Sequence, residues 1–230
     1  MIFSRRRGDA VRRTAPAAPP TGSEASVARP AFGPYDVTQA PSDDRARLDL
    51  GALQVPAVPG VEIQLQAGPQ GQVQRVLLAH EASQLQLGVY AAPRTQGIWD
   101  EIRAEMVSSL AQGGGRPREV DGEYGTEVRA QVRESGGGVI DVRHVGIDGP
   151  RWFVHGIFVG AAAIDPDRSG PLRDVLHGLV VDRCDEARPV REALPMRLPP
   201  EAAAELAGAT GSDRGNGAGT PAAADGEEAQ

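Results

Sequence analysis

Residues 139–160 read Val-Ile-Asp-Val-Arg-His-Val-Gly-Ile-Asp-Gly-Pro-Arg-Trp-Phe-Val-His-Gly-Ile-Phe-Val-Gly, and this stretch decides the fold. Its two arms, 139–147 and 151–160, flank Asp148-Gly149-Pro150, a turn sequence that is a strong signal for a β-hairpin. The second arm is almost continuously apolar, which is typical of a strand covered on both faces. The stretch therefore predicts a hairpin whose second strand lies at the centre of a sheet.

Further strands are predicted on the N-terminal side of the hairpin. Apolar and polar residues alternate over 61–66, 73–78 and 85–91, with short turn sequences between them. Because alternation with period two is typical of strands with one buried face, residues 61–91 predict a three-stranded antiparallel meander. Residues 126–133 alternate small or apolar side chains with charged ones and predict a strand directly before the hairpin.

Two helices separate and follow these strands. Apolar residues recur every four positions from Ile98 to Leu110, which predicts an amphipathic helix of about 15 residues. Thr95 is its expected N-cap, and the glycines that begin at Gly113 end it. A second apolar stripe follows Pro171, a residue that suits the first position of a helix.

The order of elements is β-β-β-α-β-β-β-α, which favours an α+β fold over a doubly wound parallel sheet. We expect one antiparallel β-sheet of about six strands packed with two main helices. Residues 1–44 are rich in Pro, Ala and Arg, and residues 201–230 are acidic and rich in Ala and Gly. Such segments bury too little apolar surface to offset the entropy of ordering. We therefore expect disordered tails at 1–44 and 201–230, and a single α+β domain at 45–200.

Composition excludes several function classes. All 24 basic residues are arginine, so a Schiff-base lysine and a Gly-Lys-Ser/Thr phosphate loop are ruled out. A net charge of −7 argues against a dedicated nucleic-acid binder. Contact with nucleic acid is expected only through the basic N-terminal tip, which consists of Arg5, Arg6, Arg7, Arg12 and Arg13. The single cysteine, Cys184, cannot form an internal disulfide, and no apolar run reaches the ~20 residues of a membrane span. We expect a cytoplasmic protein.

The hairpin carries two histidines that are candidates for a site. His144 and His155 lie on opposite arms, and the turn places them opposite each other or one position out of register. Such a pair can bind a metal or sense pH. The alternative is that one faces solvent while the other packs in the sheet. No set of nucleophile, base and oxyanion donors is visible, so we predict no catalytic, cofactor-binding or metal-binding residue.

Two tryptophans, each near an arginine, are candidates for interaction with a partner. Trp152 follows Arg151 at the hairpin turn, and Trp99 lies close to Arg94. Tryptophan and arginine are enriched at protein interfaces. Core packing is the other use of a tryptophan in a chain with 4% aromatic residues.

Four segments resemble a conserved actinobacterial family of unknown function. They are Leu-Gln-Leu-Gly-Val-Tyr-Ala-Ala-Pro-Arg at 85–94, Trp-Asp-Glu-Ile at 99–102, Gly-Pro-Arg-Trp-Phe-Val-His-Gly at 149–156 and Leu-Pro-Met-Arg-Leu-Pro at 194–199. The resemblance covers about residues 45–200 and implies no reaction. The element order is also loosely similar to the Mog1/PsbP-like sandwich, which by analogy of fold implies binding or assembly.

These observations favour a non-enzymatic binding or assembly module of the cytoplasm with a protein partner and no cofactor. Two alternatives stay open. One is an enzyme that handles a small molecule or nucleotide at an arginine-lined site, using Arg94, Arg151 and an Asp/His pair. The other is a nucleic-acid-associated protein tethered through its basic N-terminal tip.

Overall fold

Strand β10 (Trp152–Gly160) lies at the centre of a large antiparallel sheet, as its continuous apolar sequence predicts. The computed structural model describes residues 31–68, 72–133 and 136–199. Within it, β10 pairs with β9 (Val139–Gly149) on one side and β6 (Ser83–Ala91) on the other. Both neighbours are antiparallel, so the predicted hairpin is present and its second strand is internal.

The remaining elements surround this centre in the order of the chain. They are β1 (Tyr35–Asp36), η1 (Val37–Gln39), β2 (Arg47–Asp49), β3 (Leu53–Pro56), β4 (Glu62–Ala67), β5 (Gln72–His80), α1 (Trp99–Gln112), β7 (Arg118–Gly122), β8 (Gly125–Arg133), α2 (Ala161–Ile164), η3 (Pro166–Ser169), α3 (Gly170–Gly178), β11 (Val180–Val181) and β12 (Met196–Arg197). None of the helices in the described ranges combines the length and the apolar composition that crossing a bilayer requires.

The α+β class with a large antiparallel sheet is confirmed, but the expected number of strands is wrong. The large sheet has eight strands in the order β12-β5-β6-β10-β9-β8-β7, with β4 paired to β5, and a second sheet has four strands in the order β1-β11-β3-β2. The described residues form three α-helices instead of the expected two. The missed elements carry little periodic signal, because β7 holds one large apolar residue, Val120, and β12 spans two residues.

The fold begins before residue 45, where the sequence places the start of the domain. Tyr35 and Asp36 form β1, which pairs in parallel with β11, and the Gly33 amide donates to the His177 carbonyl at 2.8 Å. The Trp152 indole donates to Asp36 at 3.0 Å. These long-range contacts have no periodic signature in residues 31–44. The expected disorder of 1–30 and 201–230 lies outside the described residues.

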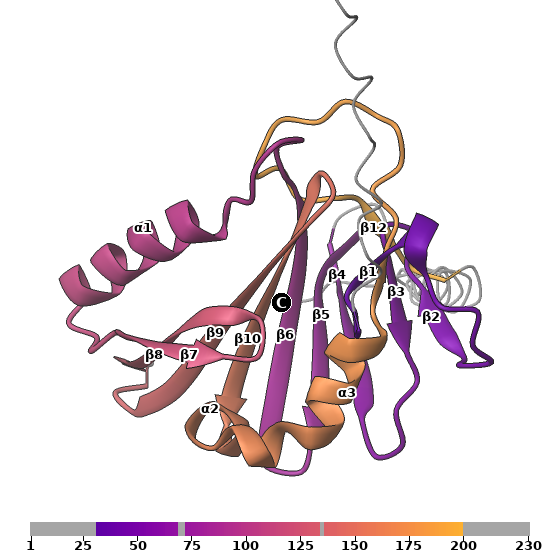
Figure 1. Ribbon diagram of the computed structural model, residues 1–230. Coiled ribbons are helices and arrows are strands. Elements are labelled where there is room, and N and C mark those ends of the chain that lie inside the picture. The colour runs from indigo at the N-terminus through magenta and orange to yellow at the C-terminus, as the bar shows by residue number, and fades with distance from the viewer. Residues whose placement is uncertain (1–30, 69–71, 134–135, 200–230) are drawn as a thin grey trace, which may run out of the picture.

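The two faces of the large sheet bury different partners. One face packs against α3 and the small sheet and forms the main core, which includes Val154 and Phe158 of β10 (Figure 1). The opposite face carries Phe153 and Val128, and these pack against Ile98 and Trp99 at the start of α1. Alternate residues of β10 therefore serve two separate cores, since side chains of a strand point to opposite faces.

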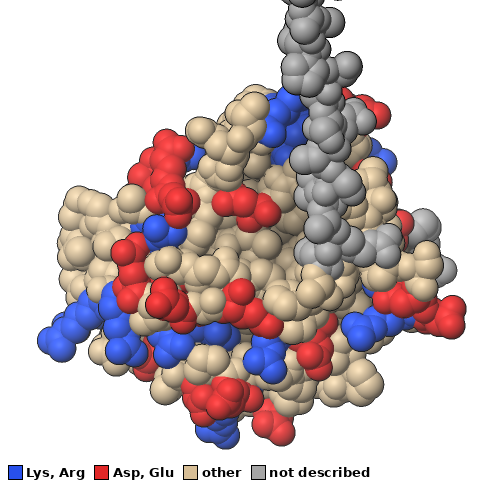
Figure 2. Space-filling model, in the orientation of Figure 1, with Lys and Arg blue, Asp and Glu red and all other residues tan. Residues whose placement is uncertain are grey.

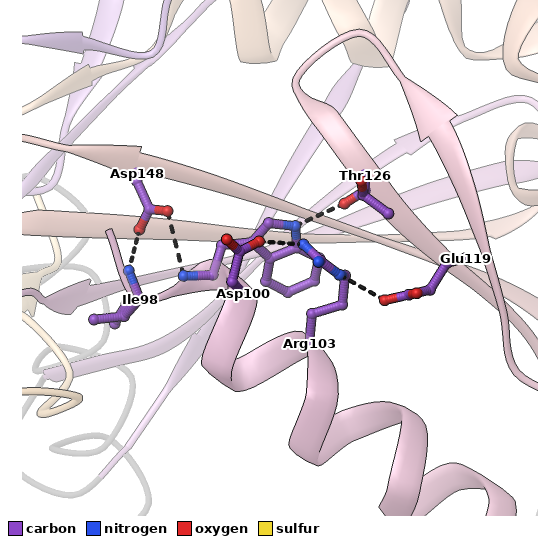
Figure 3. A network of polar contacts seen from close by, with 7 residues as sticks. Ile98, Asp100, Arg103, Glu119, Thr126 and Asp148 are labelled. Atoms are coloured by element: carbon purple, nitrogen blue, oxygen red, sulfur yellow. Dashed lines mark hydrogen bonds and ion pairs between the residues drawn. The ribbon is translucent and has the colours of Figure 1, made fainter. Parts of the chain in front are cut away.

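Helix α1 is held to the sheet at its N-terminus by a residue of β9. The carboxylate of Asp148 accepts hydrogen bonds from the Ile98 amide at 2.8 Å and from the Trp99 amide at 3.2 Å (Figure 3). Asp148 thus provides the cap that the sequence assigns to Thr95. The Trp99 indole donates to the Thr126 carbonyl at 2.7 Å.

A glycine makes room for the Trp99 ring. A Cβ on Gly146 of β9 would lie 2.1 Å from this ring, so only glycine allows the indole to lie flat on the sheet. The Trp99 ring stacks on Phe153 with ring centroids 5.9 Å apart. The first turn of α1 is therefore anchored by both polar and aromatic contacts.

Replacing Asp148 with alanine is expected to lower the free energy of unfolding by about 1–2 kcal/mol, because two buried helix-start amides lose their acceptor. Chemical denaturation of Asp148→Ala against Asp44→Ala, an exposed aspartate, measures the effect. Equal stability of the two variants would show that the cap contributes nothing.

Candidate functional site

The two tryptophans predicted as candidates are core residues. Trp99 is 5% exposed and Trp152 is 2% exposed, and both indole nitrogens donate hydrogen bonds inside the protein. Their side chains are not accessible to a partner in this fold. This removes both from the candidate interaction residues and matches the core alternative.

The two arginines beside them lie on the loops that flank β6 and β10. Arg94 is exposed on the segment between β6 and α1. Arg151 occupies the hairpin turn with a φ of 64°, and its carbonyl accepts hydrogen bonds from the Ala92 amide and the Arg183 side chain. Neither arginine lines the cavity described below, so their role in binding stays a prediction.

His144 and His155 are in contact on the face of the sheet that α1 covers. Their ring nitrogens lie 3.2 Å apart, and their rings stack with centroids 5.3 Å apart. His144 pairs with Ile157 and His155 pairs with Gly146, so the two histidines are diagonal neighbours, two positions out of register. The sequence predicts them opposite each other or one position out of register, and this prediction is wrong. The pKa of each imidazole is lowered to about 4, by burial for His144 and by burial together with the charge of His144 for His155.

This histidine pair supplies two potential metal ligands. Among the residues that the structure describes, no group of three or more His, Cys, Asp or Glu side chains is placed to hold a metal ion. The rings instead extend the aromatic stack of Trp99 and Phe153, since His155 lies 6.0 Å and 6.1 Å from these two rings. The geometry therefore points to a neutral, packed pair.

A different group of residues forms a polar cavity on the opposite face of β8 and β9. The cavity has a volume of about 160 Å³ and lies where these strands meet η3 and α3. Its lining includes Tyr124, Glu127, Arg129, Arg143, Phe158 and Arg173. We call it the inner cavity. Sequence analysis singled out none of these residues.

Arg143 is the most buried arginine of the inner cavity. It is 5% exposed, its Nη1 lies 3.4 Å from the Glu127 carboxylate, and its guanidinium lies 4.1 Å from the centre of the Phe158 ring. Burial is the main cause that lowers the pKa of Arg143, and burial likewise raises the pKa of Glu127. The low polarity of the site thus acts on both members of the pair, although each stabilises the charge of the other.

The strand register brings two more arginines into line with Arg143. Arg143 of β9 lies directly opposite Arg129 of β8, which lies directly opposite Arg118 of β7. We call this the arginine row. Like charges directly opposite each other destabilise a sheet, so the row lowers the stability of these three strands. Arg173 approaches from α3, and its charge and that of Arg129 help to lower the pKa of Arg143.

Three arginines of the inner cavity have a donor without a partner. The Nε atoms of Arg129, Arg143 and Arg173 are buried and have no hydrogen-bond acceptor among the described residues. A buried donor left unpaired costs about 1–3 kcal/mol. All three residues line the inner cavity, so unpaired arginine donors gather around it.

Three carboxylates also line the inner cavity, those of Asp121, Glu123 and Glu127. Glu123 bonds to His177 at 3.0 Å. Among the described residues, Glu127 is the carboxylate that lies within 4.0 Å of one of the three arginines. Figure 2 shows arginine side chains in a band that runs from β7 and β8 toward α2 and α3, with Asp and Glu side chains directly above and below it.

One signal in the sequence marks the inner cavity. Arg143 has the same parity along β9 as Val145 and Ile147, so period-two alternation places it on the core side of its strand. A charged residue at a core position is a functional candidate. The contributions of Arg129 and Arg173 depend on strand register and helix docking, which no local pattern encodes.

Residues 33–205 match a protein family that is described as "Protein of unknown function (DUF3710)". No curated protein matches the chain. Among solved structures, the solution structure of cyanobacterial PsbP (CyanoP) from Synechocystis sp. is similar, with 13% sequence identity and a TM-score of 0.32. That similarity covers 59% of this chain and 91% of the cyanobacterial chain.

The histidine pair predicts a pH dependence of stability. The pKa of both imidazoles is lowered to about 4 in the folded chain, so between pH 6.5 and pH 4 the unfolded chain binds protons that the folded chain does not. The free energy of unfolding is therefore expected to fall as the pH falls through this window, by up to about 3 kcal/mol per histidine.

Denaturation at pH 7 and pH 5 checks this expectation in three proteins. His144→Gln/His155→Gln should lose less stability between the two pH values than the wild type, whereas His80→Gln should match the wild type. An identical loss in the double variant and the wild type would contradict a neutral buried pair.

Proposed function

The chain belongs to the family of unknown function DUF3710, and we propose that it is a binding module for a small molecule with a phosphate group. The observation that carries the proposal is the unpaired Nε of Arg143, a guanidinium that is 5% exposed and lines the inner cavity. The phosphate would contact Arg143 together with Arg129 and Arg173. The single cysteine supports the reducing cytoplasm as the place where it acts.

Phosphate fits the chemistry of this cavity. A phosphate group offers several acceptor oxygens and a negative charge, and the guanidinium group presents a planar fork of donors that matches them. A ligand of this kind would offer acceptors to the three guanidinium groups and reduce the repulsion between neighbouring arginines. Both effects occur at low polarity, where charge–charge interactions are stronger than in water.

The Glu127 carboxylate provides a counter-charge for Arg143 without contacting its Nε. The carboxylate contacts Nη1, and the buried Nε of the same guanidinium has no acceptor among the described residues. Removing one member of a buried pair leaves the other charge uncompensated, which typically costs 3–5 kcal/mol. We therefore assign Glu127 a role in keeping Arg143 charged and positioned.

A binding role is also what the sequence favours, but the sequence places the arginine-lined site elsewhere in the chain. The arginine-lined site proposed here is the inner cavity, which Arg94 and Arg151 do not line, and a role of these two residues in binding stays a prediction. A protein partner and a role for the basic N-terminal tip stay predictions, and residues 1–30 lie outside the described part of the chain.

Titration calorimetry with inorganic phosphate tests the proposal. The wild type is expected to bind phosphate in a buffer where chloride keeps the ionic strength constant. Arg173→Gln is expected to weaken binding at least tenfold, since a charge-assisted hydrogen bond contributes about 1.5–3 kcal/mol. Arg173 is the preferred position because it lies outside the buried ion pair and its loss leaves Glu127 paired.

Arg75→Gln is the matched control, because Arg75 is an exposed arginine of β5 that does not line the inner cavity. It should bind phosphate as the wild type does. Absence of phosphate binding by the wild type, or equal affinities of Arg173→Gln and Arg75→Gln, would refute the proposal.

A further inference from the structure

A second cavity adjoins the inner one and shares an arginine with it. It has a volume of about 250 Å³, and its lining includes Arg116, Arg118, Arg129, Gln131, Asp141 and Ile164. We call it the outer cavity. Arg129 lines both cavities, so the two are separated by the width of one side chain.

The arginine row runs from one cavity into the other. Arg143 lines the inner cavity, Arg118 lines the outer cavity, and Arg129 lies between them in the same register. Adjacent strands lie about 4.8 Å apart, so neighbouring arginines of the row are spaced by about that distance at their backbones. Two anionic groups that share Arg129 would therefore be direct neighbours in one ligand.

The outer cavity is positively charged and open. Arg116 and Arg118 are exposed, and neither lies within 4.0 Å of a carboxylate among the described residues. The carboxylate of Asp141 accepts a hydrogen bond from Gln131 at 3.2 Å. Arg129 donates from Nη1 to the Ile164 carbonyl at 3.3 Å, which fixes its guanidinium at the boundary of the two cavities.

From this arrangement, and resting on the proposed function, we infer that the ligand is a phosphoric anhydride with at least two linked phosphoryl groups. The terminal phosphoryl group occupies the inner cavity against Arg143 and Arg173. The next one occupies the outer cavity against Arg116 and Arg118, and Arg129 contacts both. The rest of the ligand leaves through the outer cavity.

The size of the inner cavity favours a small ligand over a nucleic-acid strand. A volume of about 160 Å³ is below the ~300–1,000 Å³ of pockets that enclose drug-sized molecules. It accommodates a terminal phosphoryl group, whereas the phosphates inside a nucleic-acid strand are flanked by a sugar on each side.

Calorimetric titration with inorganic phosphate and inorganic pyrophosphate, without divalent cations, tests this inference. The wild type is expected to bind pyrophosphate at least tenfold more tightly than phosphate. Arg116→Gln/Arg118→Gln is expected to remove most of this preference. Arg173→Gln should weaken both anions, and Arg75→Gln should leave both affinities as in the wild type.

The outcomes separate this inference from the proposed function. Equal affinities for phosphate and pyrophosphate in the wild type would overturn the anhydride assignment and leave the phosphate site standing. An unchanged preference in Arg116→Gln/Arg118→Gln would overturn the assignment of the outer cavity. Failure of both anions to bind would overturn the proposed function itself. Tighter binding of a single-stranded oligonucleotide without terminal phosphates than of pyrophosphate would replace the anhydride with a nucleic-acid backbone.

Discussion

The buried positive charge of Arg143 is the constraint on which the region around the inner cavity depends. It belongs to an internal strand, is 5% exposed, and is held between the Glu127 carboxylate and the Phe158 ring. Buried ion pairs often contribute no more to stability than apolar residues of similar size, because desolvation offsets the attraction. Stability alone therefore does not account for this pair. The proposed anion site would account for it, since a bound anion would offer acceptors to the three arginines.

The rest of the fold compensates for the stability that is lost through repulsion in the arginine row. Strands β7, β8 and β9 carry arginines in direct register on one face of the sheet, and the opposite face packs Val128 of β8 and Phe153 of β10 against α1. The cap from Asp148 and the ring of Trp99 fix that helix at the edge where the row lies. Helix α3 buries Leu172, Val175 and Leu176 in the main core and thereby positions Arg173 over the inner cavity. Apolar burial on both faces of one sheet thus holds a repulsive cluster of charges in place.

The parts of this architecture that depend on local pattern could be predicted from the sequence. The hairpin around Asp148, the central position of β10 and the helix after Ile98 follow from periodicity and turn residues. The small sheet, strand β7 and the start of the fold near Tyr35 could not be predicted, because their pairing is long-range and their segments are short or polar. For the site, alternation along β9 marks Arg143 as a charge on the core side. Its meeting with Arg173 depends on how α3 docks, which no local signal encodes.

The most direct measurement of the central claim follows the arginine side chains themselves. In ¹H–¹⁵N spectra of the wild type, the Nε–H resonances of Arg129, Arg143 and Arg173 should shift on addition of inorganic phosphate and saturate together. The Nε of Arg188 is also buried and unpaired among the described residues, but it lies in the segment between β11 and β12, away from the inner cavity. Its resonance should stay in place. Movement of all four resonances alike, or of none, would contradict an anion site in the inner cavity.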